Sequence, residues 1–342
     1  MIGLEAINGG AAWYRCDPPM ILGEAPIYRD SDSSLHWVDC LANPPELHIL
    51  KVDPDTGDAL GRARILKLSD SVTVQFFRKD TPGSYICAYY QGVAFLDEET
   101  GRLDVLKEII PTEDRGIRRF NDGGVDVKGR FWLAEIDIKA MGFGPNKLPQ
   151  SYGTPIGRLW RYDPDGSLHE MDNGFVCGNG LAWSPDNKTS KHILRVHMHS
   201  IVVKLTVLQV YVNDSVAMKV FSYDFDAETG AISNKTLFID RRDSFGEPDG
   251  MVVDTEGNLW IAVFDSNRVM VFSPEGVHLK DILFTARNMA CTTWGGRNMN
   301  LLFVATGKDR KPTAKAEDEG GHMFLYKAPP GVTGTDKHKF AG

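Results

Sequence analysis

The chain has 342 residues, of which 42% are hydrophobic and 25% are charged, and its formal net charge is −8 at pH 7. Acidic and basic residues are scattered without a block of like charge, so the sequence predicts no nucleic-acid partner. The longest apolar runs are shorter than a membrane span, so it predicts no membrane partner either.

The N-terminal stretch MIGLEAINGG lacks the basic and apolar regions of a secretory signal, which favours a cytoplasmic location. Five cysteines lie far apart, and their odd number argues against a disulfide framework. We therefore expect reduced, buried thiols at Cys16, Cys40, Cys87, Cys177 and Cys291.

One phrase recurs along the chain: a polar turn, an apolar strand, and a second strand that ends in an acidic turn. Asp-Gly, Glu-Gly and Thr-Gly pairs follow many of these strands and supply the positive φ that tight hairpins need. Each copy therefore predicts a small antiparallel meander. The six copies occupy, in chain order, residues 31–60, 83–106, 125–171, 182–233, 252–283 and 293–329.

A single meander cannot bury its apolar faces, so the six copies must stack against one another. Radial stacking around an axis gives a six-bladed β-propeller. A β-sandwich is the alternative all-β fold, but it does not require six similar copies. The sequence predicts that residues 1–342 form a single propeller domain.

Residues 190–210, SKHILRVHMHSIVVKLTVLQV, do not fit the repeat, because they interrupt a hairpin and contain no Gly, Pro, Asp or Glu. Functional interpretations are a metal cluster of His192, His197 and His199 or a basic amphipathic strip. An interpretation based on gene structure explains more of these features. The possible codons allow the donor, branch and acceptor signals of an intron of about 60 nucleotides. We therefore predict an aberrant insertion within one blade, arising from a retained intron or a gene-model error.

Polar residues beside glycine or proline precede predicted strands in four places. The inner strands of a propeller converge on a central channel, so such residues can meet at one mouth. Any one of them taken alone has the alternative role of capping a turn. They are Glu24 in ILGEAPIY, Asn121 and Asp122 in RRFNDGGVD, Asn179 in CGNGLAW and Asp249 in EPDGMVVD.

Glu24, Asn179 and Asp249 offer hard oxygen donors with a combined formal charge of −2. Such donors suit one divalent cation whose coordination shell is completed by water. Calcium, zinc, manganese and ferrous iron all remain candidates.

Four phrases carry a family resemblance: LGEAPIY…LHWVD, RFNDGGVDVKGRFWLAE, GNGLAWSPDNKT and PDGMVVDTEGNLWIA. In this order they resemble the senescence-marker-protein, gluconolactonase and luciferin-regenerating-enzyme family, which includes regucalcin. The resemblance extends from about Glu24 to about Gly307. It implies a six-bladed propeller with one divalent metal in the central channel. By motif match, Glu24, Asn179 and Asp249 are its ligands.

The resemblance also implies hydrolysis of a small lactone, such as a sugar-acid lactone, by metal-activated water. Asp249 is the candidate that orients or deprotonates this water, since one carboxylate oxygen can bind the metal while the other acts as a base. Arg119 and Asn121 match substrate-holding residues. Glu135 ends a predicted strand, where it either faces the channel as a further substrate contact or closes the turn.

Other functions stay open, because the chain departs from the family pattern after GRFWLAEI, which leaves the choice of substrate in doubt. The same metal site could hydrolyse phosphotriesters, or the protein could bind calcium without turnover. Asp249 together with Arg119 and Asn121 favours an enzyme, because a binding protein needs metal ligands but no substrate clamp. The expected partner is a small-molecule lactone, and the expected assembly is a monomer or weak homodimer.

Overall fold

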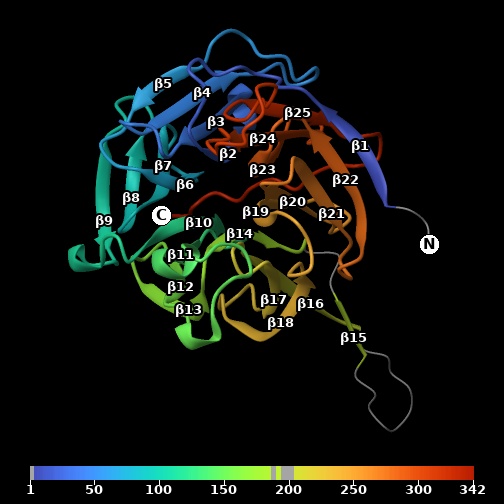
Figure 1. Cartoon of the computed structure of the whole chain (residues 1–342). Helices are drawn as coiled ribbons and strands as arrows, with labels where there is room; N and C mark the ends of the chain where they lie inside the picture. Colours follow the sequence, from blue (N-terminus) through green and yellow to red (C-terminus); the bar gives the residue numbers. More distant parts are fainter. Residues whose placement is uncertain (1–3, 186–189, 194–203) are drawn as a thin grey trace.

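The structure is a computed structural model that describes residues 4–185, 190–193 and 204–342. Its strands form six sheets arranged around one axis (Figure 1), which confirms the predicted all-β, six-bladed propeller. Among the described residues, helix is confined to α1 (Ile138–Met141) and to short 3-10 turns at Asp30–Asp32, Thr112–Asp114 and Gln150–Tyr152.

The first three blades each contain four antiparallel strands that follow one another in the chain. Blade 1 consists of β2 (Gly23–Arg29), β3 (Ser34–Asp39), β4 (Glu46–Lys51) and β5 (Arg64–Lys67). Blade 2 consists of β6 (Val72–Phe77), β7 (Ser84–Tyr89), β8 (Gly92–Asp97) and β9 (Leu103–Glu108). Blade 3 consists of β10 (Arg118–Val125), β11 (Phe131–Asp137), β12 (Gly157–Tyr162) and β13 (Leu168–Phe175).

The last three blades depart from this plan. Blade 4 consists of β14 (Gly178–Trp183), β16 (Lys204–Asp214), β17 (Lys219–Phe225) and β18 (Ile232–Asp240), with β15 (Ser190–Ile193) paired to β16. Blade 5 consists of β19 (Glu247–Val253), β20 (Leu259–Phe264), β21 (Arg268–Phe272) and β22 (His278–Phe284), to which β1 (Glu5–Gly10) adds in parallel. Blade 6 consists of β23 (Asn288–Gly295), β24 (Leu301–Gly307) and β25 (Met323–Lys327).

The innermost strands form a closed ring around the channel. They are β2, β6, β10, β14, β19 and β23, and β2 of the first blade contacts β23 of the last. Each inner strand pairs with only one strand, the next one of its own blade, and it also contacts the inner strands of the two adjacent blades.

The predicted hairpin turns are confirmed. Glycines of the Thr-Gly, Asp-Gly and Glu-Gly pairs between strands adopt positive φ, which a residue with a Cβ atom rarely does. These glycines are Gly57, Gly101, Gly166, Gly230, Gly257 and Gly276.

The inner strands share an irregularity in their pairing with the second strand of each blade. At each such β-bulge one strand carries an extra residue, which changes the direction of the local side chains. The register shifts lie between Glu24 and Ile27, Val72 and Val74, Phe120 and Gly123, Gly178 and Leu181, Pro248 and Met251, and Met289 and Cys291.

These bulges correct one expectation about the site residues. None of the predicted site residues precedes a strand: Glu24 lies inside β2, Asn121 and Asp122 inside β10, Asn179 inside β14 and Asp249 inside β19. Neither Gly180 nor Gly250 is among the positive-φ glycines. A Cβ atom on Gly180 would lie 2.4 Å from the Asp249 carbonyl oxygen, so this glycine is required for close packing of adjacent inner strands.

Aromatic side chains fill the spaces between blades. Trp132 of blade 3 packs edge-on against Trp183 of blade 4 with ring centroids 5.9 Å apart. Trp260 of blade 5 packs similarly on Trp294 of blade 6 at 5.1 Å. Such edge-to-face pairs stabilise the stacking of neighbouring sheets beyond the area that they bury.

The predicted insertion at residues 190–210 falls partly outside the described residues, since residues 194–203 are not described. β15 pairs only with the first part of β16, from Ser190 with Val207 to Ile193 with Lys204. The rest of β16 belongs to blade 4, where Val210 pairs with Trp183. Figure 1 shows β15 projecting from the edge of the propeller, beyond the other strands of its blade.

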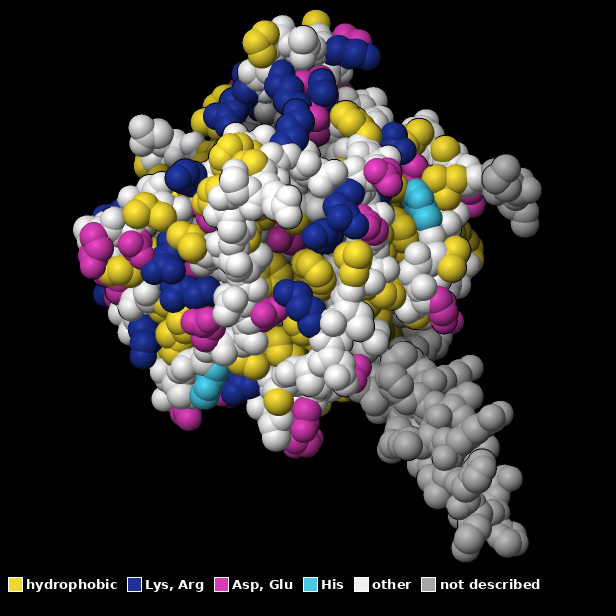
Figure 2. Space-filling view, turned by 60° about the horizontal axis from the view of Figure 1, so that its bottom comes forward, with side chains coloured by type: hydrophobic (Ala, Val, Ile, Leu, Met, Phe, Trp, Pro, Cys, Tyr) yellow, Lys and Arg dark blue, Asp and Glu magenta, His cyan; other side chains and the backbone are white. Residues whose placement is uncertain are grey.

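The prediction of buried, unpaired thiols is confirmed. All five cysteines are free and buried. No helix of the described residues combines the length and hydropathy needed to cross a bilayer. On the face shown in Figure 2, acidic and basic side chains are interspersed.

Candidate active site

The residues predicted at the channel mouth come together from four blades. Glu24, Asn121, Asn179 and Asp249 occupy the first half of β2, β10, β14 and β19, each at or beside the bulge of its strand. Since inner strands surround the channel, these bulges direct polar side chains toward its axis. We call this end of the channel the entrance.

Glu24 and Asp249 form the electrostatic centre of the site. Burial raises the pKa of Glu24, and the nearby Asp122 carboxylate raises it further. Burial likewise raises the pKa of Asp249, and Glu24 and Asp122 add to this effect. Like charges within a desolvated channel explain both shifts.

Asp122 is the site residue to which the sequence assigned no role. It lies beside Asn121 at the bulge of β10, with a side chain that is 7% exposed. Burial raises its pKa to about 6. Its position in the motif Asn-Asp-Gly-Gly signalled a site residue, but only the structure places its carboxylate near those of Glu24 and Asp249.

Hydrogen bonds hold Asp249 and Asn179 in place. The Asn213 side chain donates to the Asp249 carbonyl oxygen, and the Asn179 Oδ1 atom accepts from the Gly180 backbone N–H at 2.9 Å. The Asn179 side chain also contacts Asp249 and partly offsets the rise of its pKa. The Asp249 Oδ1 atom is buried without a hydrogen-bond partner. An unpaired buried carboxylate oxygen is costly unless a ligand satisfies it.

The donor set fits a divalent cation. Glu24, Asp249 and Asn179 provide oxygen atoms from three blades, and one of these atoms has no protein partner. In the described part of the chain, no three His, Cys, Asp or Glu side chains lie close enough together to hold a metal by themselves. The predicted set has only two carboxylates, and its third donor is an amide.

Arg119 and Asn121 lie next to these carboxylates in β10. The Arg119 guanidinium lies 4.8 Å from the centroid of the Tyr90 ring, and its Nη1 atom donates to the Phe120 carbonyl oxygen at 2.9 Å. Asn121 Nδ2 donates to the Gly178 carbonyl oxygen at 3.1 Å. The charge of Arg119 lowers the pKa of Glu24, although burial and Asp122 outweigh this effect.

Glu135 lies outside the cluster of carboxylates. Its side chain is fully buried and accepts hydrogen bonds from Arg158 Nη2 at 2.9 Å and from Trp160 Nε1 at 2.7 Å. Both donors belong to β12, the neighbouring strand of the same blade. These bonds favour a structural role for Glu135, and its predicted contact with substrate remains untested.

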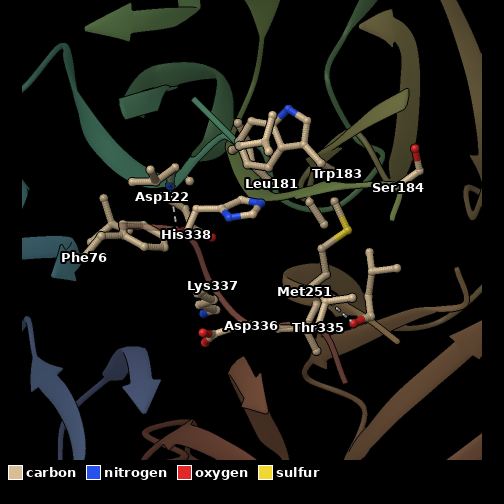
Figure 3. A pocket seen from close by; sticks show the side chains of 18 of the residues that line it. Phe76, Asp122, Leu181, Trp183, Ser184, Met251, Thr335, Asp336, Lys337 and His338 are labelled. Atoms are coloured by element: carbon tan, nitrogen blue, oxygen red, sulfur yellow. Dashed lines mark hydrogen bonds between the residues drawn. The ribbon is translucent and has the colours of Figure 1, made fainter. Parts of the chain in front are cut away.

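A cavity of about 270 Å³ lies on the other side of the carboxylates from Arg119. Asp122, Met251 and Cys291 line its inner part, and Trp183 and Val253 line its outer part. The outer residues end their inner strands, so this is the far end of the channel. Thr335–His338 of the C-terminal tail cross it, as Figure 3 shows.

This architecture defines a class of protein: a six-bladed propeller with a polar, acidic site inside its channel. The comparison with protein families then identifies the family within this class. The family described as "SMP-30/Gluconolactonase/LRE-like region" matches residues 22–193 and 207–308, so the chain belongs to this family. Residues 194–206, within the predicted insertion, lie between the two matched segments.

Individual relatives agree with this assignment. Regucalcin of Danio rerio is 26% identical over 330 residues, which cover 94% of this chain and 95% of the relative. The 6-deoxy-6-sulfogluconolactonase of Pseudomonas putida is 27% identical over 324 residues, covering 95% and 96%. The solved structure described as the calcium-binding protein regucalcin of Agrobacterium tumefaciens has a TM-score of 0.77 at 21% identity, covers 99% of both chains and shares the fold.

Proposed function

We propose that the protein is a divalent-metal-dependent hydrolase that opens a small sugar-derived lactone. One observation carries the proposal: Glu24, Asn179 and Asp249 offer oxygen donors inside the channel, beside the hydrogen-bond donors of Arg119 and Asn121. Membership of the family, and the lactonase named among the relatives, support the same conclusion. Glu24, Asn179 and Asp249 would hold the ion.

When bound, the ion would polarise the lactone carbonyl, stabilise negative charge on its oxygen and lower the pKa of a bound water. Asp249 accepts the proton of the attacking water, because a carboxylate can keep one oxygen on the ion and use the other as a base. The bond from water oxygen to the carbonyl carbon forms, the bond to the ring oxygen breaks, and the proton passes to that leaving oxygen. The product is a hydroxy acid, which releases one proton to solvent near neutral pH.

Arg119 and Asn121 orient the substrate in this mechanism. The Arg119 guanidinium is held against the Tyr90 ring, so its remaining N–H groups face a defined direction. Such groups donate to hydroxyl or ring oxygens of a sugar lactone. Holding the substrate at a fixed angle to Asp249 lowers the entropic part of the barrier.

The experiment is a proton-release assay on a panel of five- and six-membered sugar lactones. Turnover should disappear with a chelator and return with calcium, manganese, zinc or ferrous iron. Asp249→Asn should lower kcat by about two to four orders of magnitude, because it removes the base. Full activity and full metal affinity in Asp249→Asn would refute the assigned role.

Arg119→Met tests the substrate clamp and has a matched control in Arg118→Met. The neighbouring Arg118 side chain pairs with Asp114, outside the carboxylate cluster. We expect Arg119→Met to lower kcat/KM by about 100-fold and Arg118→Met to change it little. Hydrolysis of a phosphotriester instead of every lactone, or metal binding without any turnover, would each overturn the proposed activity.

A further inference from the structure

The C-terminal tail, residues 329–342, runs across the far end of the channel (Figure 1). It bonds to four blades: the backbone N–H of Gly334 donates to Met299, that of Thr335 to Val253, that of Phe340 to Phe77, and that of Ala341 to Gly129. Val253 and Phe77 are the last residues of inner strands β19 and β6. The tail backbone therefore closes the end of the channel opposite the entrance.

Lys337 extends from this tail back into the middle of the channel. Its Nζ atom donates to the Pro26 carbonyl oxygen at 3.0 Å and to the Thr292 carbonyl oxygen at 3.1 Å. These acceptors lie in the interior of β2 and β23, and Pro26 is two residues from Glu24. Both acceptors are neutral, so these bonds orient the ammonium group without cancelling its charge.

The charge of Lys337 acts on the carboxylates from the side opposite the entrance. Lys337 and Asp122 line the same cavity (Figure 3). Burial raises the pKa of Asp122, and Lys337 acts in the opposite direction; it has the same lowering effect at Glu24. The carboxylate cluster thus lies between Arg119 on the entrance side and Lys337 on the side of the C-terminal tail.

We propose that Lys337 is a resident counter-ion of the Glu24, Asp122 and Asp249 cluster, which stabilises the metal-free channel and weakens the binding of a divalent cation. This inference rests on the proposed metal site. Three ionised carboxylates carry a formal charge of −3, and the ammonium group of Lys337 reduces it to −2. Without Lys337 the metal-free cluster keeps the full charge of its carboxylates, and a cation entering it meets no repulsion from the tail.

The test is metal titration of chelator-treated protein by calorimetry, with calcium and with manganese, at pH 8. Lys337→Met keeps the aliphatic stem and removes the charge. We expect its Kd to be about tenfold lower than that of the parent chain, and its metal-free form to unfold at a lower temperature. Lys337→Arg keeps the charge, and Lys339→Met removes an exposed charge of the same tail. Both should remain close to the parent chain.

A double variant guards against loss of folding in Lys337→Met. Asp122→Asn combined with Lys337→Met has the net charge of the parent site, so its Kd should return toward the parent value. A folded Lys337→Met with unchanged or weaker affinity would overturn the inference while leaving the metal site intact. Equally, a double variant that binds as tightly as Lys337→Met would overturn it. Failure of the parent chain to bind any of the cations would refute the proposed function instead.

Discussion

At the scale of single residues, the glycines beside the site residues are required by packing. A Cβ atom on Gly250 would lie 2.4 Å from the Cys291 Sγ atom and 2.7 Å from its Cα atom. Backbone atoms cannot move aside as a flexible side chain can. This explains why glycine follows Asp249 in β19.

Gly250→Ala should therefore destabilise the fold by about 2 kcal/mol and displace Asp249, since overpacking forces the two inner strands apart. Urea unfolding measures the first effect and metal titration the second. Gly142→Ala is the control, because its new Cβ atom would meet no atom closer than 3.3 Å and its φ is not positive. Equal urea midpoints for the two variants would contradict the packing argument.

His36 gives a pH dependence at the same scale. Its side chain is fully buried, with Nδ1 2.8 Å from the Tyr85 hydroxyl and Nε2 2.7 Å from the Ser34 hydroxyl. Burial holds the pKa of His36 well below its usual range. The Phe77 ring packs edge-on against the imidazole. The surrounding charged groups are Arg29, Asp32, Lys51 and Arg64.

Because the folded state keeps His36 neutral while the unfolded state takes up a proton, stability is lost as pH falls through about 6.5. Between pH 7 and pH 5, protonation of His36 in the unfolded state lowers the free energy of unfolding by about 2 kcal/mol. His36→Gln should remove it, so the free energy of unfolding should fall less steeply with acid than in the parent chain. Urea unfolding at pH 7 and pH 5 measures this difference. An equal fall in the free energy of unfolding for His36→Gln and the parent chain would show that His36 does not contribute.

At the scale of elements, blade 4 is the one whose sequence departs from the repeat. β16 is 11 residues long, and only its last part pairs with β14. The preceding part pairs with β15 instead, in a separate two-stranded ribbon. The sequence analysis treated residues 190–210 as an insertion that interrupts a hairpin and predicted no strands within it, whereas the structure forms β15 and the first part of β16 there. The pairing partner of these strands is set by the fold.

We predict that residues 190–210 can be replaced by a single methionine without loss of folding. The methionine would join Thr189 to Tyr211 and restore one continuous strand between β14 and β17. Thermal unfolding should remain cooperative with a midpoint no lower than that of the parent chain, because β15 pairs only with Lys204–Val207. Lys188, Thr189 and the new methionine would replace Leu208, Gln209 and Val210 beside β17. Sequencing of the cDNA is the independent check. A variant that unfolds without a cooperative transition would show that the segment is integral to the blade.

At the scale of the whole molecule, the C-terminal tail ties distant blades together. Phe340 is 1% exposed and packs against Tyr162 of blade 3 and Phe95 of blade 2, with ring centroids 6.1 and 6.3 Å away. Its backbone pairs with Phe77 and Lys79. No pattern in the sequence predicted these contacts, since the tail lies beyond the last repeat.

Phe340→Ala should lower the free energy of unfolding by about 3 to 5 kcal/mol, because it removes a buried aromatic ring between two blades. Lys339→Ala, at an exposed position of the same tail, should have little effect. Chemical denaturation of both variants measures the difference. A Phe340→Ala protein as stable as Lys339→Ala would mean that the tail does not fasten the ring.

The sequence by itself determined the blade number and the hairpin turns, because these depend on local spacing and turn chemistry. It also singled out Glu24, Asn179 and Asp249 by motif, and their role as metal ligands stays a prediction. It did not determine that the Asp122 carboxylate lies near that of Glu24, or that Arg158 donates a hydrogen bond to Glu135. It also did not determine that the Lys337 side chain enters the channel. Those facts depend on which strands the closed ring brings together and on where bulges direct their side chains. Contacts between residues far apart in the chain are decided by tertiary packing alone.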